Sequence, residues 1–265
     1  MPELPEVVTV KNFLKTAVEG RKIEHVQVNY SKMMSALLKN SLTGQYIHTI
    51  SSKGKYIIFH LDDFDLISHL RMEGKYYIPK SKEINKHDHV IFYFKDFQLR
   101  YNDTRKFGTF ELKYKKDTYT TKPLSLLADE PFDIDPNTFY QALHKSNRKI
   151  KTLLLDQTII SGIGNIYANE ILFLSKINPN RLGNQIKKGE SSKIIKHSIK
   201  VLNEAIMQGG TTLHTFTNNG EVGYFAQSLL VHGKALKPCP ICGTKIIKEK
   251  INGRMSYSCP VCQKE

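Results

Sequence analysis

The first six residues, Met-Pro-Glu-Leu-Pro-Glu, combine side chains and an amine that could do chemistry together. Removal of Met1 would leave Pro2 with a free secondary amine. An α-amino group has a pKa of about 8 against about 10.4 for lysine, so part of this amine is unprotonated and nucleophilic near neutral pH. Attack on a sugar aldehyde carbon would form an iminium ion, which stays cationic and accepts electrons from later eliminations. Pro2 is therefore a candidate Schiff-base nucleophile.

Two carboxylates lie next to this amine in the sequence. Glu3 and Glu6 are three residues apart, and Pro5 between them suits the first turn of a helix. Both acids would then lie near the amine and near the positive end of the helix. One carboxyl could donate a proton while the other holds negative charge. The alternative is a disordered N-terminus with ordinary helix-start acids, which are common.

The four cysteines of the chain lie within its last 27 residues, as two C-x-x-C pairs separated by sixteen residues. Two tight pairs at this spacing can surround one tetrahedral zinc ion. A redox pair is the alternative, but the spacing favours one structural Zn²⁺. The expected ligands are Cys239, Cys242, Cys259 and Cys262.

The segment between the cysteine pairs presents one arginine. Residues 245–257 alternate in polarity, which predicts a β-hairpin, and Arg254 follows the turn signal Asn252-Gly253. The planar guanidinium suits a phosphate group, although a single arginine on a finger is usually just a solvated charge.

A glycine-containing turn lies between two expected helices in residues 158–170. Gly162, Gly164 and Asn165 form this turn, so backbone amides and the Asn165 side chain could hold a phosphate at the start of the next helix. A glycine turn between helices is more often only a turn. The incoming helix carries basic residues, among them Lys151, and this favours contact with a DNA backbone.

Three further segments could contact a ligand. Lys55 begins an expected strand and could bind a phosphate or the reacting sugar, or be a solvated strand-end lysine. Met72, Arg105 and Phe107 lie in two loop segments, and such side chains can fill the gap left by a nucleotide that is extruded from a duplex. Without this context Met72 and Phe107 would be core residues. A polar loop over 209–221 is long enough to close over a ligand.

The elements that position these residues follow from periodicity. Apolar residues at helical spacing predict a helix from the N-terminus to Gly20, and a period of two from 22 to about 113 predicts a β-sandwich or barrel packed against it. Helical spacing returns over about 136–145, 147–158, 164–175 and 190–208. We therefore expect an α+β chain: an N-terminal helix and β-sandwich domain (1–113), a linker (114–135), a helical domain (136–228) and a zinc finger (229–265).

The charge of the chain indicates its partner. The 265 residues carry a net charge of +14, with lysine and arginine spread along the sequence and a pI near 9.5. Nucleic acid is the natural partner of such a chain. A basic membrane-associated protein is the alternative, but no apolar run approaches 18 residues and no signal peptide opens the chain. We expect a soluble, cytoplasmic, nucleoid-associated monomer.

Taken together, these motifs resemble the formamidopyrimidine-DNA glycosylase family, which excises oxidised purines and then cuts the strand. The resemblance covers nearly the whole chain, and its motifs come in the family's order. They are P-E-L-P-E-V, K-G-K-Y, H-L-R-M-E-G, K-H-D-H, R-Y-N-D-T-R-K-F-G, L-D-Q-T followed by G-I-G-N-I-Y-A-N-E in a helix–two-turn–helix segment, Q-G-G-T-T-L, and the zinc tail with G-R and C-P-V-C-Q.

The resemblance implies roles for the catalytic candidates. Pro2 would be the nucleophile at C1′ of the lesion, and Glu3 the acid that helps to open the sugar ring. Lys55 would serve β-elimination and bind phosphate. Arg254 would serve δ-elimination and hold the phosphate of the extruded nucleotide, while Asn165 would grip the backbone.

The resemblance also implies DNA contacts and a substrate. Met72, Arg105 and Phe107 would fill the void and face the orphaned base, and His87 and Lys151 would add contacts to damaged double-stranded DNA. The substrates would be 8-oxoguanine and formamidopyrimidines, removed by a bifunctional glycosylase and AP lyase. No organic cofactor or catalytic metal is needed.

The sequence departs from the family pattern at two positions, and three alternative functions would explain parts of it. Val8 stands where the family usually has an acid, and Thr104 where proline is common. The endonuclease VIII type shares the catalytic candidates but prefers oxidised pyrimidines. A non-catalytic protein that senses damaged DNA, or a zinc-ribbon RNA-binding protein, would explain the charge and the zinc, but neither needs the N-terminal amine and acids.

Overall fold

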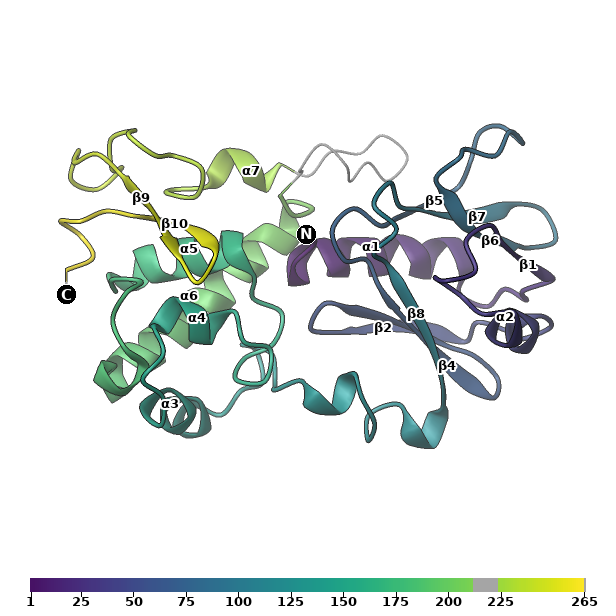
Figure 1. Ribbon diagram of the computed structural model, residues 1–265, viewed down its shortest axis with the longest axis horizontal. Coiled ribbons are helices and arrows are strands. Elements are labelled where there is room, and N and C mark those ends of the chain that lie inside the picture. Colours follow the sequence, from purple (N-terminus) through teal and green to yellow (C-terminus); the bar gives the residue numbers. More distant parts are fainter. Residues whose placement is uncertain (212–223, 265) are drawn as a thin grey trace. The chain divides into compact units, whose positions relative to one another are not determined.

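The computed structural model describes residues 1–211 and 224–264, and the chain divides into two compact units (Figure 1). The first unit contains Met1–Ser125 and Gly209–Tyr224, and the second contains Leu126–Gln208 and Phe225–Glu265. The segment that begins at Gly209 therefore belongs with the N-terminal unit, whereas the sequence pattern placed it in the helical domain. Most of the polar loop predicted over 209–221 lies outside the described residues.

The first unit is a sandwich of two four-stranded antiparallel sheets behind an N-terminal helix, α1 (Leu4–Val18). The strand orders are β1-β6-β7-β5 and β2-β3-β4-β8. The strands are β1 (His25–Val28), β2 (Thr49–Lys53), β3 (Tyr56–His60), β4 (Phe64–His69), β5 (Lys75–Tyr77), β6 (Asp88–Tyr93), β7 (Gln98–Asn102) and β8 (Thr109–Tyr114).

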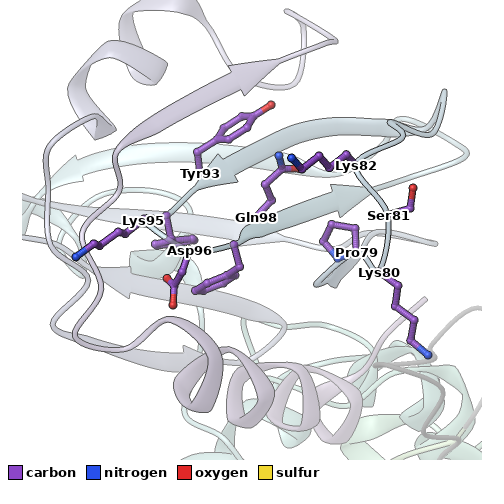
Figure 2. A pocket seen from close by; sticks show the side chains of 10 residues that line it. Pro79, Lys80, Ser81, Lys82, Tyr93, Lys95, Asp96 and Gln98 are labelled. Carbon is purple, nitrogen blue, oxygen red and sulfur yellow. The ribbon is translucent and has the colours of Figure 1, made fainter.

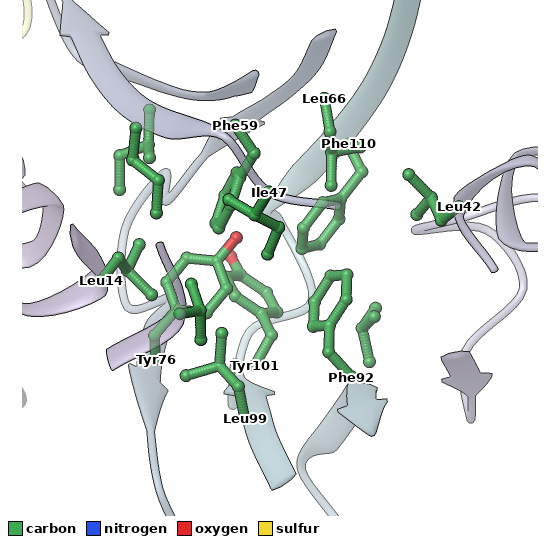
Figure 3. Packing of buried hydrophobic residues seen from close by; sticks show 14 of the residues in the cluster. Leu14, Leu42, Ile47, Phe59, Leu66, Tyr76, Phe92, Leu99, Tyr101 and Phe110 are labelled. Atoms are coloured by element: carbon green, nitrogen blue, oxygen red, sulfur yellow. The ribbon is translucent and has the colours of Figure 1, made fainter. Parts of the chain in front are cut away.

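The core of this unit follows from the sequence period. Alternate strand residues point into the sandwich, and α1 adds the apolar face formed by Val7, Val10, Leu14 and Val18. Large aromatic side chains fill the middle, where Tyr101 contacts Tyr76 and Phe110 edge-on at centroid distances of 5.0 Å (Figure 3). The expected β-sandwich with an N-terminal helix is confirmed.

One helix of this unit was not predicted. The sequence pattern indicates strands throughout 22–113, but α2 (Ala36–Leu42) interrupts them. Ser35 caps it, because its Oγ accepts the Leu38 N–H at 3.2 Å. A capping serine before a short run of helix formers was the local signal, and the alternating pattern on both sides obscured it.

The second unit is helical and carries the finger. Its helices are α3 (Pro136–His144), α4 (Ile150–Leu154), α5 (Asn165–Ser175), α6 (Lys188–Met207) and α7 (Phe225–Ser228). A hairpin of β9 (Ile247–Ile251) and β10 (Arg254–Ser258) follows, as the alternating pattern predicted. Among the 3₁₀ turns, η1 (Lys115–Asp117) lies in the first unit, η2 (Leu124–Leu126) lies where the first unit ends, and η3 (Gly183–Gln185) lies in the second unit.

The helix predicted over 147–158 is shorter than expected. It ends at Leu154, and Asp156 then forms a local turn in which its Oδ1 accepts the backbone N–H of Thr158 at 3.0 Å and the hydroxyl at 2.7 Å. Such side-chain bonds compete with helical ones.

Within the described residues, no helix is long and apolar enough to span a membrane.

Candidate active site and DNA-binding surfaces

The N-terminal residues are buried and held by one carboxylate. Pro2 and Glu3 precede α1, and Glu3 is 3% exposed. The Glu6 carboxylate accepts the Glu3 N–H on Oε2 at 2.9 Å, and the Thr211 N–H and hydroxyl on Oε1 at 2.8 and 2.9 Å. Glu6 therefore joins the segment that carries Pro2 and Glu3 to a residue 205 positions further along the chain.

Lys55 lies in the tight turn between β2 and β3 and is only 6% exposed. The neighbouring His69 is also buried, and burial together with the positive charges of Arg71 and Lys55 lowers the pKa of His69 to about 3. Its Nδ1 accepts the Arg71 N–H at 2.9 Å, which requires the neutral ring. This part of the unit therefore combines cationic groups with a histidine that stays uncharged at neutral pH, an environment suited to an anion.

The neutral His69 predicts a loss of stability in mild acid. Its pKa is depressed in the folded state, so between about pH 6.5 and pH 3 the unfolded chain binds a proton that the folded chain does not. Stability therefore falls as the pH falls, by about 2 kcal/mol between pH 7 and pH 5. His69→Asn keeps an acceptor for Arg71 without a titrating ring, so urea unfolding at both pH values should show a smaller loss. Equal losses in the two proteins would contradict this assignment.

Met72 lies in a turn that is closed by a hydrogen bond. The Gly74 N–H donates to the Leu70 carbonyl at 3.0 Å. Phe107 lies in a second turn after β7 and is 51% exposed. The Arg105 guanidinium lies 4.9 Å from the centroid of the Phe107 ring. The arginine thus lies over the face of an exposed aromatic ring, as in a cation–π pair.

Asp103 builds this second turn. Its carboxylate accepts the backbone N–H groups of Arg105, Phe107 and Gly108 at 3.0, 2.9 and 2.8 Å, and His89 Nε2 bonds its carbonyl at 2.9 Å. Asp103 is fully buried. The sequence motif contained this residue, but only the folded turn reveals its role.

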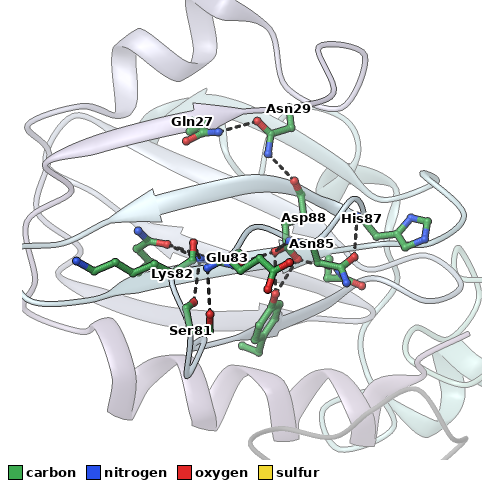
Figure 4. A network of polar contacts seen from close by, with 12 residues as sticks. Gln27, Asn29, Ser81, Lys82, Glu83, Asn85, His87 and Asp88 are labelled. Atoms are coloured by element: carbon green, nitrogen blue, oxygen red, sulfur yellow. Dashed lines mark hydrogen bonds and ion pairs between the residues drawn. The ribbon is translucent and has the colours of Figure 1, made fainter.

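His87 ends a basic loop that a buried ion pair supports (Figure 4). Arg100 is 1% exposed and donates to Asp88 Oδ2 at 3.2 Å and to the Lys82 carbonyl at 3.1 Å. Asp88 also accepts the Asn85 N–H at 3.0 Å, while the His87 ring points away from this network. Arg100 and Asp88 were not among the predicted site residues, because their partners come from separate parts of the sequence.

A separate groove of about 340 Å³ lies at the β6–β7 hairpin (Figure 2). Lysines line it, but Lys80 and Lys95 point away from it in opposite directions. Asp96, also in its wall, is paired with Arg21 at 3.5 Å. The groove therefore lacks the converging polar groups of a specific site.

In the second unit, the turn residue Asn165 begins α5 and contacts the hairpin. Its Nδ2 donates to the Met255 carbonyl at 3.1 Å, and its Oδ1 is buried without a hydrogen-bond partner among the described residues. Arg254 is the first residue of β10 and is exposed next to this contact. The structure therefore brings Asn165 close to the strand that carries Arg254.

The Lys151 side chain bonds the second strand of the hairpin, β10. The sequence predicts a DNA contact for it, but the side chain is fully buried, and its ammonium donates to Met255 O at 2.8 Å and to Ser256 Oγ at 2.7 Å. In this structure the ammonium is therefore occupied by acceptors on the hairpin and is not exposed at the surface. We therefore assign Lys151 to holding the strand that begins with Arg254.

This assignment predicts the effect of Lys151→Met, which keeps the length of the side chain and removes its donors. The buried Ser256 hydroxyl then loses its donor, which costs about 1–3 kcal/mol, whereas Met255 O keeps the Asn165 amide as a donor. We expect a lower melting temperature and faster hydrogen exchange confined to residues 252–257. The exposed Lys149→Met, whose ammonium bonds the Asn180 side chain at 2.6 Å, is the matched control. Unchanged exchange in the hairpin of Lys151→Met would argue against this role.

The four cysteine sulfurs form a cluster in which all lie within 4.8 Å of one another. The Cys239–Cys262 and Cys242–Cys259 sulfur distances are 3.9 and 3.5 Å. Sulfurs at the corners of a tetrahedron with Zn–S bonds of about 2.3 Å lie about 3.8 Å apart, so the cluster fits one zinc ion. Its chemistry there is structural, because four thiolates leave no open position.

These features define a class of zinc-finger DNA glycosylases, and comparisons with known proteins place the chain within it. Residues 1–110 match the formamidopyrimidine-DNA glycosylase N-terminal domain, residues 127–217 its H2TH domain, and residues 237–264 the zinc finger found in FPG and IleRS. The chain belongs to the formamidopyrimidine-DNA glycosylase family of DNA repair enzymes.

Individual relatives match over all or nearly all of their length. The formamidopyrimidine-DNA glycosylase of Oceanobacillus iheyensis is 42% identical over 99% of this chain and 98% of its own, and that of Listeria innocua is 41% identical over all of both chains. A Lactococcus lactis FPG mutant bound to Fapy-dG containing DNA superposes over all of both chains with a TM-score of 0.95 and 41% identity. Wild-type Lactococcus lactis FPG bound to oxidised pyrimidine containing DNA superposes with a TM-score of 0.93, at the same identity and coverage.

Proposed function

We propose that this enzyme removes oxidised purines, namely 8-oxoguanine and formamidopyrimidines, from duplex DNA and cuts the strand by β,δ-elimination. The observation that carries this proposal is the N-terminus: Pro2 and Glu3 are buried together at the start of α1, and Glu6 locks their segment to Thr211. The family to which the chain belongs, and the damaged DNA bound by its structural relatives, support the same function.

The chemistry begins at the Pro2 nitrogen once Met1 has been removed. The nitrogen bonds to C1′, the bond from C1′ to the base breaks, and the base leaves with a proton. Glu3 protonates O4′ as the sugar ring opens, which leaves an iminium ion between Pro2 and the sugar. This cation withdraws electrons from C2′, so loss of a C2′ proton expels the 3′ phosphate.

A second elimination completes the cut. Loss of a further proton expels the 5′ phosphate, with Arg254 holding the phosphate group, and water releases the sugar remnant from Pro2. Lys55 serves the first elimination, and the cationic surroundings of His69 favour the phosphate near it. The zinc ion takes no part in these steps and serves only to hold the hairpin that carries Arg254.

Residues of both units would hold the DNA. In the first unit, Met72 and Phe107 occupy the space of the extruded nucleotide, Arg105 faces the orphaned base and His87 contacts the backbone. In the second unit, Asn165 grips the backbone at the start of α5. We propose that the enzyme acts as a monomer on chromosomal DNA in the cytoplasm.

This mode of binding predicts strong dependence on salt. Each phosphate that a lysine or arginine neutralises releases counterions, so log K should fall linearly with log salt at a slope of about −0.9 per phosphate contact. Titration of an abasic-analogue duplex between 50 and 200 mM salt, followed by fluorescence anisotropy, measures this slope. An affinity that stays flat over that range would count against the proposed contacts.

Oxidised pyrimidines are the second candidate substrate. A relative 41% identical to this chain binds oxidised pyrimidine containing DNA, so such lesions fit a protein of this architecture. Single-turnover excision from duplexes with 8-oxoguanine opposite cytosine and with thymine glycol opposite adenine separates the two. We expect faster excision of 8-oxoguanine, with phosphates at both ends of the gap. Faster excision of thymine glycol would favour the endonuclease VIII type.

A further inference from the structure

Tyr101 lies directly beneath the two turns that carry Met72 and Phe107. It is fully buried on β7, with its ring edge-on to Tyr76 and Phe110 (Figure 3). Its hydroxyl is buried and has no hydrogen-bond partner in the part of the chain that the structure describes. A phenolic hydroxyl usually finds a partner when buried, so this oxygen costs stability and its presence needs another explanation.

Two glycines contact this oxygen from the two turns. A Cβ atom on Gly74 would lie 1.9 Å from Tyr101 Oη, and one on Gly108 would lie 1.8 Å from it. Neither glycine has a positive φ, so their backbone conformations are open to other residues. The requirement for glycine at both positions is therefore steric. At Gly108 the three nearest atoms all belong to Tyr101, whereas at Gly74 an added Cβ would also lie 2.7 Å from the Leu70 carbonyl oxygen.

The two glycines end the segments that hold the proposed void-filling residues. Gly74 closes the turn that carries Met72, and the Gly108 N–H bonds the Asp103 carboxylate that shapes the turn of Phe107. At the surface, the Thr104 hydroxyl donates to the carboxylate of Glu73, which lies next to Met72 in the sequence. The two turns are thus joined at the surface by this hydrogen bond and in the interior by the Tyr101 hydroxyl.

We propose that Tyr101 is a positioning residue whose hydroxyl, wedged between Gly74 and Gly108, sets the spacing of Met72 and Phe107. This inference rests on the proposed function, in which these two side chains occupy the space of the extruded nucleotide. The spacing determines how well they fill it and where Arg105 meets the opposite base. Tyr101 thereby influences excision and the choice of opposite base without touching DNA.

The test compares two reactions of the same protein. Single-turnover excision of 8-oxoguanine requires full extrusion of a paired base, whereas cleavage at a preformed abasic site starts from a nucleotide that is already unpaired. Gly74→Ala and Gly108→Ala push a turn away from Tyr101. Because displacement of about 1 Å can cost about 100-fold, we expect excision to fall about 10- to 100-fold and abasic-site cleavage to change little.

Tyr101→Phe removes the oxygen that meets both Cβ positions. In the Gly108→Ala background it should recover part of the lost excision, although ring carbon Cζ remains 2.7 Å from the added Cβ. Recovery in the Gly74→Ala background should be smaller, because the Leu70 carbonyl oxygen also lies 2.7 Å from the added Cβ. Alone, it should leave the melting temperature equal or higher, because it removes an unpaired buried hydroxyl. The ratio of excision opposite cytosine to that opposite adenine should nevertheless shift, because the turns lose their spacer.

Two matched controls distinguish a change in the spacing of the two turns from a general loss of stability. Gly189→Ala lies in α6, where an added Cβ would meet nothing within 4 Å, and should leave both reactions unchanged. Tyr76→Phe removes a neighbouring core hydroxyl that donates to Ser68 Oγ at 2.7 Å. It should lower stability without shifting the opposite-base ratio.

Distinct outcomes decide the two proposals. Equal losses of excision and abasic-site cleavage in the glycine variants, or no recovery of Gly108→Ala by Tyr101→Phe, would overturn the role of Tyr101. If the glycine variants do not fold, an unchanged opposite-base ratio in Tyr101→Phe would overturn it. Wild-type protein that lacks both reactions would instead refute the proposed function.

Discussion

Blocking the Pro2 amine should abolish strand cleavage. A protein extended by Gly-Ser in front of Pro2 converts this nitrogen into an amide, which has no free lone pair for attack on C1′ and cannot form an iminium ion. We expect strand cleavage and covalent trapping at an abasic site to fall at least about 1,000-fold, which corresponds to about 4 kcal/mol of transition-state stabilisation. Single-turnover cleavage assays on gels measure the change.

Binding provides the control for this variant. The extension leaves the lysines, arginines and turns of both units intact, so the affinity for an abasic-analogue duplex and its salt slope should stay close to those of the processed protein. Cleavage at an undiminished rate by the extended protein would show that another group is the nucleophile. Loss of binding together with cleavage would mean that the extension obstructs the site.

Glu3→Gln should separate the two activities of the enzyme. Glutamine has the shape of the acid but cannot donate its proton to the opening sugar ring, and general acid catalysis contributes about 10²- to 10⁴-fold. Excision of 8-oxoguanine should fall by this factor. Cleavage at a preformed abasic site should fall much less, because an abasic sugar already exists partly as the open aldehyde.

The fold should tolerate this substitution. The bond from residue 3 to Glu6 uses the backbone N–H, which the substitution leaves in place. Glu24→Gln, at an exposed acid 3.8 Å from Lys22, is the matched control and should change neither reaction. Equal losses of excision and abasic-site cleavage in Glu3→Gln would indicate that Glu3 acts on a shared step and not on base release.

Local patterns in the sequence predict a large part of the fold. The period of α1, the hairpin that turns at Asn252-Gly253 and the four-cysteine finger each depend on residues close together in the chain, and the structure contains all three. The helix α2 and the early end of α4 depend on single capping side chains, Ser35 and Asp156. A search for period alone misses such short signals.

The supporting contacts of the site could not be predicted in the same way. Glu6 bonds a residue 205 positions away, and Lys151 bonds one 104 positions away. Tyr101 contacts two glycines that the sequence alone cannot distinguish from glycines needed for a turn. These contacts exist only once sheets and helices have paired, so the sequence alone could not indicate what holds the predicted site residues in place.

The most direct test of the central claim is borohydride trapping. The protein, shown by mass to lack Met1, is incubated with a duplex that carries 8-oxoguanine opposite cytosine, and reductant is added. We predict a covalent protein–DNA adduct that peptide mass spectrometry maps to Pro2. Intact binding without an adduct would contradict a Schiff-base mechanism on this lesion and favour a protein that only senses damaged DNA.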